Sequence, residues 1–190
     1  MTDTAETAAL PLRRPHDNQY LAGNYAAVES EVTAHNLAVV GEIPVELEGR
    51  WLRNGPNPES VGDPTLHHWF LGTGMVHGVR LRGGKAEWYR NRFVLNAADR
   101  AAGLFGANTN VGGFAGTTWA LVEGGQPPVE LDYELNSLGV NRFHDSLDGP
   151  FTAHPKYDAS TGELHSINYH WPDLVDHVNY TVVSGDGRVT

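Results

Sequence analysis

Short stretches of alternating apolar and polar residues, separated by glycine-rich breaks, run along most of this chain. Residues 75–82 alternate in this way, Gly83-Gly84-Lys85 interrupts the pattern, and residues 86–95 resume it. Alternation over four to eight residues places the apolar side chains on one face of a β-strand. Paired glycines supply the positive φ angles of a tight hairpin turn. The pattern therefore predicts two antiparallel strands joined at Gly83-Gly84.

Other stretches of the same kind predict further strands, and none has the period of an amphipathic helix. The predicted strands and extended pieces are residues 37–44, 49–53, 67–71, 109–114, 117–122, 128–131, 163–169, 179–183 and 188–190. The first long strand is expected to end in a tight turn at Asn54-Gly55-Pro56. Residues 18–32 have no clean period and are expected to wrap over the surface. Short strands at this spacing predict an all-β fold: a sandwich, a barrel or a propeller.

The two ends of the chain differ from its middle. Residues 1–19 are polar and rich in Ala and Pro, which predicts a disordered tail before a domain over residues 20–190. That tail lacks the basic and apolar regions of a signal peptide, and no run approaches the length of a membrane helix, so a cytoplasmic location is expected. The chain stops as a strand begins after Gly185-Asp186-Gly187, which would leave an open sheet edge. We interpret residues 20–190 as part of a larger, truncated domain.

Composition excludes several classes of function. The chain has 23 acidic and 13 basic residues, a formal charge of −10. A nucleic-acid surface needs a basic field, so this class is excluded. The absence of cysteine excludes disulfides, thiolate metal sites and a cysteine nucleophile. Ten histidines, supported by Asp and Glu, remain as possible metal ligands.

One histidine stands out by its sequence context. His154 lies in Thr152-Ala153-His154-Pro155, which has the composition of a short strand that a proline ends. Pro155 offers no N–H to a sheet and biases His154 toward extended backbone angles. A histidine fixed at a strand end can aim its imidazole at one point, as a metal ligand must. From these residues alone, closing a hairpin and holding a metal ion are both possible roles.

Several other motifs fail on inspection. The glycines around Gly72 and Gly78 do not form a dinucleotide fingerprint, because the residues after them have a β pattern where a helix is required. No phosphate-binding loop or nucleophile elbow occurs. The pair His67-His68 and the residues His165 and His170 lack the helical spacing or Cys partners of a zinc site. Surface or core polar roles are expected for these four histidines.

Taken together, six stretches resemble the carotenoid cleavage oxygenase family, which also contains the retinal isomerase of the eye and the lignostilbene dioxygenases. These stretches, in the family's order and spacing, are residues 46–58, 68–79, 88–94, 108–111, 120–125 and 151–155. The resemblance implies a seven-bladed β-propeller, of which this chain would form the first blades. It also implies iron(II) on the propeller axis, held by four histidines from different blades. The first of these ligands is the His of the family's Thr-Ala-His-Pro motif, which is His154 here, and the other three would lie beyond residue 190.

The family also has glutamates that accept a hydrogen bond from ligand imidazoles and so fix their ring planes. Glu123 occupies a matching position, and its partner imidazole is expected beyond residue 190. A solvated turn residue is the alternative role for Glu123.

In function, the resemblance implies a non-haem iron(II) dioxygenase. Such an enzyme inserts both atoms of O2 into a carbon–carbon double bond of a carotenoid or apocarotenoid and gives two carbonyl products. Lignostilbene-cleaving members carry a lysine that contacts the phenolic oxygen of the substrate, and Val122 occupies that position here. Without this cation a phenolate loses a charge-assisted hydrogen bond, so a carotenoid or apocarotenoid is favoured over a stilbene. Leu71 and Thr73 replace acidic residues that flank a family glycine turn, which indicates drift or an atypical member.

Alternatives remain beside the enzyme hypothesis. The chain could be a truncated, non-catalytic fragment, a propeller remnant that binds an apolar ligand, or a protein-binding scaffold without iron. The 190 residues alone are expected to be inactive. Leu104 and Phe105 could form a core contact or a peripheral membrane contact. No stretch indicates a protein partner, so the expected partners are the polyene substrate and O2.

Overall fold

The computed structural model describes residues 18–95, 108–124, 126–169 and 178–190, and these residues form an all-β structure. The described residues contain no α-helix, only the short 3-10 helices η2 (Gln19–Leu21), η3 (Gly23–Tyr25) and η4 (Pro64–Leu66). The strands are β1 (Val32–His35), β2 (Gly49–Asn57), β3 (Thr73–Arg82), β4 (Lys85–Phe93), β5 (Asn110–Phe114), β6 (Thr117–Leu121), β7 (Val129–Leu131), β8 (Ser137–Val140), β9 (Lys156–Asp158), β10 (Glu163–Asn168) and β11 (Asn179–Val183).

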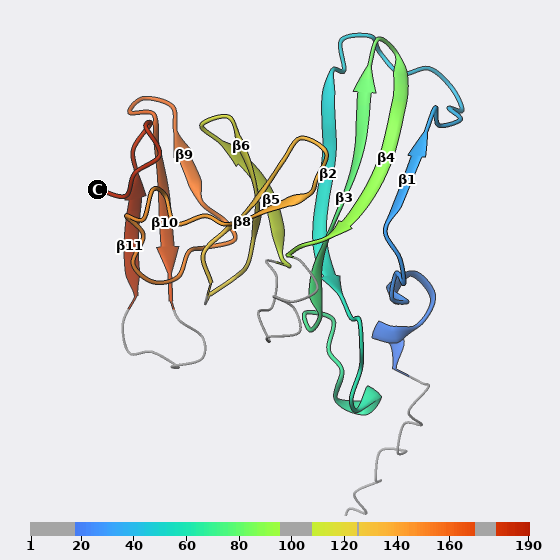
Figure 1. The fold of residues 1–190 in the computed structure, drawn as a ribbon, viewed down its shortest axis with the longest axis horizontal. Helices are drawn as coiled ribbons and strands as arrows, with labels where there is room; N and C mark the ends of the chain where they lie inside the picture. Colours follow the sequence, from blue (N-terminus) through green and yellow to red (C-terminus); the bar gives the residue numbers. More distant parts are fainter. Residues whose placement is uncertain (1–17, 96–107, 125, 170–177) are drawn as a thin grey trace, which may run out of the picture.

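The strands form three antiparallel sheets that follow one another along the chain (Figure 1). Sheet A has the order β1-β4-β3-β2, sheet B the order β5-β6-β7-β8, and sheet C the order β11-β10-β9. Most neighbouring strands are consecutive in sequence, as expected for sheets built from hairpins and short connections. The all-β class predicted from the alternating pattern is therefore confirmed.

The hairpin of β3 and β4 is the clearest success of the pattern. Its turn is at Gly83 and Gly84, whose φ angles of +53° and +73° are both in the left-handed region. A two-residue turn of this kind needs positive φ at both positions, which glycine adopts without a steric penalty. Val79 then lies opposite Tyr89, and the side chains of such a pair share one face of the sheet.

Two apolar clusters hold the three sheets together, and β6 contributes to both. Ala120 packs into the cluster between sheets A and B, whereas Trp119 and Leu121 pack into the cluster between sheets B and C. The first cluster consists of Val76, Trp88, Val94, Leu95, Ala120, Val129, Leu131 and Leu135, and the second of Trp119, Leu121, Phe143, Leu147, Phe151, Ala153, Leu164 and Val183. Period-two alternation thus places successive side chains of β6 in the two different clusters.

Two buried asparagines attach the segment before β1 to sheet A. The Asn57 side chain accepts from the Val28 N–H at 2.7 Å and donates to the Val28 carbonyl at 2.9 Å. Asn91 donates to the Ser30 carbonyl at 3.1 Å and accepts from the N–H of Val32, the first residue of β1, at 2.5 Å. The amide side chain replaces the partner strand that this segment lacks, so its backbone groups remain satisfied.

The predicted turn at Asn54-Gly55-Pro56 is wrong, because β2 continues through it to Asn57. Pro56 lies opposite Gly74 in the β2–β3 ladder. Since β2 is an edge strand of sheet A, a proline fits where its nitrogen faces away from the ladder, because no N–H is needed there.

The predicted strand over residues 67–71 is also wrong. The Leu71 N–H donates to the His68 carbonyl at 2.9 Å, which closes a turn. Trp69 stacks with Phe70 at a ring-centroid distance of 5.9 Å and with Tyr20 at 6.4 Å. The aromatic residues of this run make ring contacts with the N-terminal segment and do not pair in a β-ladder.

Three smaller differences concern short strands. Residues 37–44 are not assigned to a strand, whereas β1 and β8 form at positions where the pattern predicts none. Both are four residues long and contain no buried residue, so no apolar face marks them in the sequence. Of the predicted arm at residues 188–190, only a bridge between Val183 and Val189 forms.

Residues 1–17 of the predicted tail lie outside the described residues, but Asn18 caps η2 by accepting from the Tyr20 N–H.

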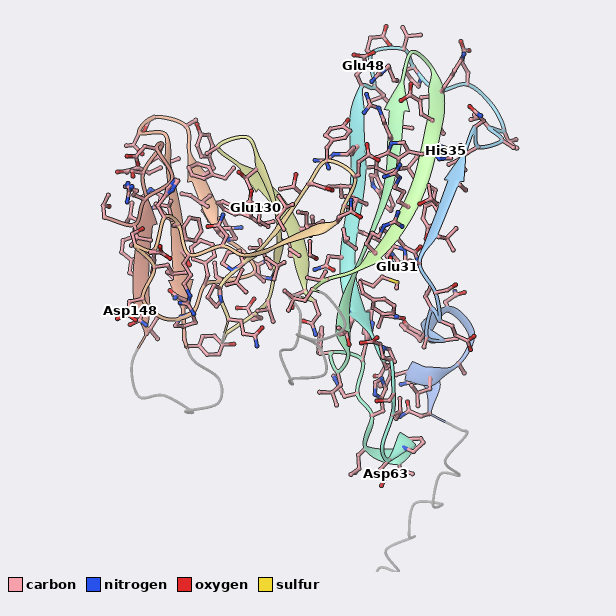
Figure 2. The ribbon with its side chains drawn as sticks, viewed as in Figure 1. Glu31, His35, Glu48, Asp63, Glu130 and Asp148 are labelled. Atoms are coloured by element: carbon pink, nitrogen blue, oxygen red, sulfur yellow. The ribbon has the colours of Figure 1, made fainter. Side chains whose placement is uncertain are left out.

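The labelled acidic side chains Glu48, Asp63, Glu130 and Asp148 are distributed over different parts of the structure (Figure 2), in line with the negative net charge. In the described part of the chain, no helix has the length and apolar character needed to cross a bilayer.

Candidate metal centre

His154 lies in the connection between sheets B and C, one residue before Pro155 and two before β9. The prediction that it ends a strand is wrong, because Phe151 to Pro155 are not in a strand and Pro155 instead leads into β9. The reason is that the backbone here finds partners outside any ladder. The Phe151 N–H donates to the Gln126 carbonyl at 3.3 Å, and the Ala153 carbonyl accepts from the Asn110 side chain at 2.8 Å.

The backbone around His154 is held tightly while its ring is accessible. Phe151 and Ala153 are buried in the cluster between sheets B and C. The His154 N–H donates to the Thr152 hydroxyl at 3.2 Å. The His154 side chain, in contrast, is 60% exposed. A fixed backbone with a free imidazole is the arrangement that a metal ligand requires.

Glu123 faces this imidazole from two residues after the end of β6. Its Oε2 lies 3.4 Å from Nε2 of His154, and its side chain is 41% exposed. The Glu123 N–H donates to the Thr109 hydroxyl at 3.4 Å, and the Thr109 N–H donates to the Leu121 carbonyl. The next residue, Gly124, has a φ of +57°, and a Cβ there would lie 3.0 Å from the Tyr169 ring. The chain therefore leaves β6 in a conformation that glycine favours, directly after the carboxylate.

The two residues singled out from sequence, His154 and Glu123, are thus brought together, although they are 31 positions apart in the chain. The expected partner imidazole of Glu123 beyond residue 190 stays a prediction, and His154 is an imidazole neighbour within the chain itself. A carboxylate can accept a hydrogen bond from an imidazole N–H and so set the tautomer and ring plane of that imidazole.

Within the described ranges, no three His, Asp or Glu side chains converge to hold a metal ion. One accessible imidazole beside a carboxylate is the donor chemistry of a single ligand to a first-row divalent metal. The residues present therefore fit one position of a histidine-ligated metal site.

His77, His67 and His165 lie in other environments than His154, although Oε2 of Glu163 lies 3.8 Å from Nε2 of His165. Nδ1 of His77 lies 2.8 Å from the Tyr89 hydroxyl, and burial, with a smaller effect of Arg53, lowers the pKa of His77 to about 4. Burial, with a smaller effect of His68, also lowers the pKa of His67. Nδ1 of His165 lies 2.6 Å from the Tyr180 hydroxyl, in line with the polar role expected for it. His170 lies outside the described residues.

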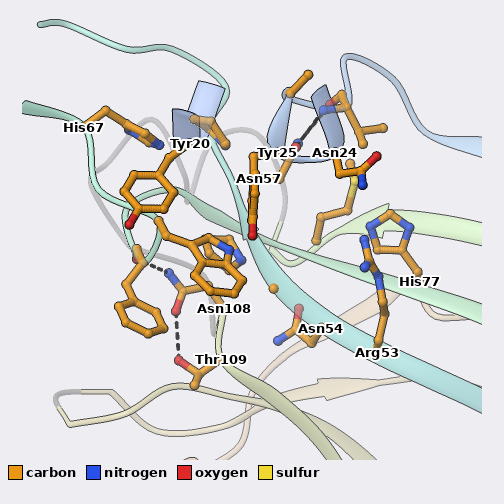
Figure 3. A pocket seen from close by; sticks show the side chains of 18 residues that line it. Tyr20, Asn24, Tyr25, Arg53, Asn54, Asn57, His67, His77, Asn108 and Thr109 are labelled. Carbon is orange, nitrogen blue, oxygen red and sulfur yellow. Dashed lines mark hydrogen bonds between the residues drawn. The ribbon is translucent and has the colours of Figure 1, made fainter. Parts of the chain in front are cut away.

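A cavity of about 300 Å³ lies beside His77 (Figure 3). Its wall combines aromatic side chains of the N-terminal segment with polar residues of β2 and β3, among them Arg53, Asn57 and His77. Apolar side chains such as Trp69, Phe70 and Met75 line it together with these polar residues. The apolar-ligand-binding remnant stays an alternative hypothesis.

Sequence reasoning did not single out Asn110 or Thr109 individually, although they hold the two candidate residues. Their signal is the run Asn108-Thr109-Asn110 at the start of a strand. Such residues form side-chain bonds to nearby backbone groups, but a run of this kind does not reveal which loop it will bind.

A family model described as retinal pigment epithelial membrane protein matches residues 25–190, which is most of the chain. The chain belongs to the carotenoid cleavage oxygenase family. A carotenoid cleavage oxygenase of Mycobacterium tuberculosis is 48% identical over 186 residues, covering 90% of this chain and 37% of that protein. The carotenoid 9,10(9',10')-cleavage dioxygenase 1 of Arabidopsis thaliana is 33% identical, covering 95% of this chain and 40% of that protein.

Solved structures of the family have the same fold. The Pseudomonas brassicacearum lignostilbene dioxygenase superposes with a TM-score of 0.77 at 27% identity, covering 92% of this chain and 42% of that chain. A variant of the Synechocystis apocarotenoid oxygenase gives a TM-score of 0.70 at 24% identity, which is evidence for the fold alone. The family resemblance and the partial β-propeller are thereby confirmed. The chain spans about two fifths of the length of these relatives.

Proposed function

We propose that residues 20–190 are the amino-terminal portion of a non-haem iron(II) dioxygenase that cleaves a carbon–carbon double bond of a carotenoid or apocarotenoid. The observation that carries this proposal is the pairing of His154 with Glu123 at 3.4 Å, in a chain that belongs to the carotenoid cleavage oxygenase family. A cytoplasmic location and a peripheral membrane contact stay predictions, and Leu104 and Phe105 lie outside the described residues.

In this proposal His154 supplies one of four imidazole ligands, and three come from the rest of the protein. Neutral imidazoles leave the metal its full charge, and bound iron(II) would supply the one-electron and O2 chemistry that no side chain can. Glu123, whose Oε2 lies 3.4 Å from Nε2 of His154, would help to fix the ring plane of a ligand imidazole by accepting a hydrogen bond from it. The reaction consumes one alkene and one O2, and both oxygen atoms end in the two carbonyl products.

Position 122 supports a polyene substrate over a phenolic one. Val122 is partly buried and packs against the cluster between sheets A and B. An apolar side chain that faces the core offers no charge to a phenolate oxygen, so a hydroxystilbene would lack a charge-assisted hydrogen bond here.

The test uses the intact protein that carries this chain, reconstituted with iron(II) and supplied with an apocarotenal and ¹⁸O2. We expect two carbonyl products, each with one ¹⁸O atom, and slower turnover of a hydroxystilbene. An iron-loaded protein that cleaves no polyene would contradict the proposal, and faster cleavage of the hydroxystilbene would contradict its substrate class.

The fragment hypothesis makes a separate prediction. One imidazole cannot hold iron(II) with the affinity of an enzyme, so the isolated 190-residue chain should contain no stoichiometric iron and cleave nothing. Bound iron in a monodisperse, cooperatively melting sample of the isolated chain would contradict this expectation.

A further inference from the structure

Asn110, the first residue of β5, connects that strand to the loop that carries His154. Its Nδ2 donates to the Ala153 carbonyl at 2.8 Å, and its Oδ1 accepts from the Val111 N–H at 2.8 Å. Because one end must donate and the other must accept, the orientation of this amide is fixed by its partners. Ala153 is the residue directly before His154 and is 0% exposed.

A second asparagine holds the backbone of Asn110 from the neighbouring sheet. Asn54 lies in β2, and its Nδ2 donates to the Asn110 carbonyl at 3.0 Å. Two successive hydrogen bonds from asparagine side chains therefore connect sheet A, through the start of sheet B, to the loop before sheet C. The His154 loop is thus located relative to the two preceding sheets, and not only by its own chain.

We propose that Asn110 is a positioning residue for His154 in metal binding, with Asn54 supporting it; this inference rests on the proposed function above. The His154 ring is mostly exposed, and the contact that the structure gives it is with Glu123. Its direction is therefore set mainly by the peptide between Ala153 and His154. The Ala153 carbonyl cannot reach water, so loss of its donor makes that peptide rotate toward another partner. Such a rotation carries the Cβ of His154, and the imidazole with it, away from its position.

A merely structural role for Asn110 would predict lower stability without any change at the metal. Asn57 provides the control, because its side chain also donates one hydrogen bond to the carbonyl of a distant segment and accepts one, although here from that segment and not from the next residue. It donates to the Val28 carbonyl and accepts from the Val28 N–H, and it is 6% exposed. Both of these Asn57 bonds are to Val28, in the segment before β1, and neither involves the His154 loop.

The experiment compares the variants Asn110→Leu and Asn57→Leu in the intact protein, since leucine has a similar size and adds no charge. The readouts are the dissociation constant for iron(II), the ligand-field absorption of the cobalt(II)-loaded protein, and the thermal unfolding of the metal-free protein. We expect both variants to lower the unfolding temperature. Only Asn110→Leu should weaken iron(II) binding, by about 10-fold, and shift the cobalt spectrum.

Two results would overturn the inference while leaving the proposed function intact. One is an Asn110→Leu protein with wild-type iron(II) affinity and cobalt spectrum, and the other is equal weakening in Asn57→Leu. If Asn110→Leu does not fold, Asn54→Ala tests the same path, with an expected weakening of about 3-fold because Asn54 acts through a further residue, and unchanged affinity there would overturn the inference. A wild-type intact protein that binds no iron(II) would instead overturn the proposed function itself.

Discussion

The regions around His77 and His154 show how differently one chain can use an imidazole. His77 lies within β3 of sheet A, partly buried, beside the Tyr89 hydroxyl, and its pKa is lowered to about 4. His154 lies in a loop between two sheets, with its backbone fixed and its ring 60% exposed beside Glu123. In the first region the ring itself is held by its neighbours. In the second region the neighbours hold the backbone and leave the ring free to bind.

This difference shows which property marks a candidate ligand. Both histidines have polar partners, and both belong to stretches that resemble the family. Only at His154 do backbone anchors and ring access occur together, so these two features, more than burial or pKa, separate the candidate ligand from a structural histidine.

The largest expected effect breaks the anchor beneath His154. Phe151→Ala removes a ring that is 1% exposed and packs against Phe143 at a ring-centroid distance of 5.0 Å. The cavity and the lost apolar burial should lower the free energy of unfolding by about 3–5 kcal/mol. Chemical denaturation of the intact protein measures this. A loss below about 1 kcal/mol would show that the loop is not anchored in the core.

The next prediction separates the two histidines directly. His154→Ala removes one of four proposed ligands, and a quarter of the free energy of a four-ligand site is on the order of 3 kcal/mol, or about 100-fold in affinity. Iron content and the dissociation constant for iron(II) measure this effect. The control His77→Phe, of similar ring size, should retain iron. Loss of iron in the control and not in His154→Ala would reverse the assignment.

The third prediction concerns pH and the His77 region. An unfolded histidine binds a proton near pH 6.5, whereas folded His77 does so only near pH 4. Between these values the unfolded state binds more protons than the folded state. The contribution of His77 to the free energy of unfolding is therefore fully present above pH 6.5 and is lost as the pH decreases toward 4.

We expect this loss to be about 2 kcal/mol, less than a fully buried ring would give because His77 is only partly buried. The measurement is the free energy of unfolding from pH 7 to pH 4 in the wild type and in His77→Phe. An equal slope in the two proteins would assign the pH dependence to other groups.

The smallest effect tests the second member of the candidate site. Glu123→Gln keeps the shape of the side chain but removes the charge that faces His154. Iron should still bind, with an affinity reduced by about 10-fold, as titration with iron(II) can show. Wild-type affinity in this variant would favour the alternative that Glu123 is a solvated turn residue.

Alternation predicted the hairpin of β3 and β4 and most of sheets B and C, because period-two patterns report directly which face of a strand is buried. It failed where tertiary context decides. Pro56 continues a strand only because β2 is at the edge of its sheet, and Trp69 is in a turn because its ring stacks on Tyr20.

The candidate site divides in the same way. The motif around His154 could be recognised from sequence, but its loop conformation could not, because it depends on Asn110, which is 44 positions earlier in the chain. Glu123 could be proposed by resemblance, yet its distance from His154 follows from how the end of β6 meets that loop. Local patterns cannot report contacts between such distant segments.

The most direct test of the account is a crystal structure of the intact protein grown with iron(II), with anomalous diffraction recorded at the iron absorption edge. We expect one iron peak at coordination distance from the His154 imidazole, with Glu123 beside the ligand set. An iron peak bound elsewhere, with the His154 ring turned into solvent, would contradict it.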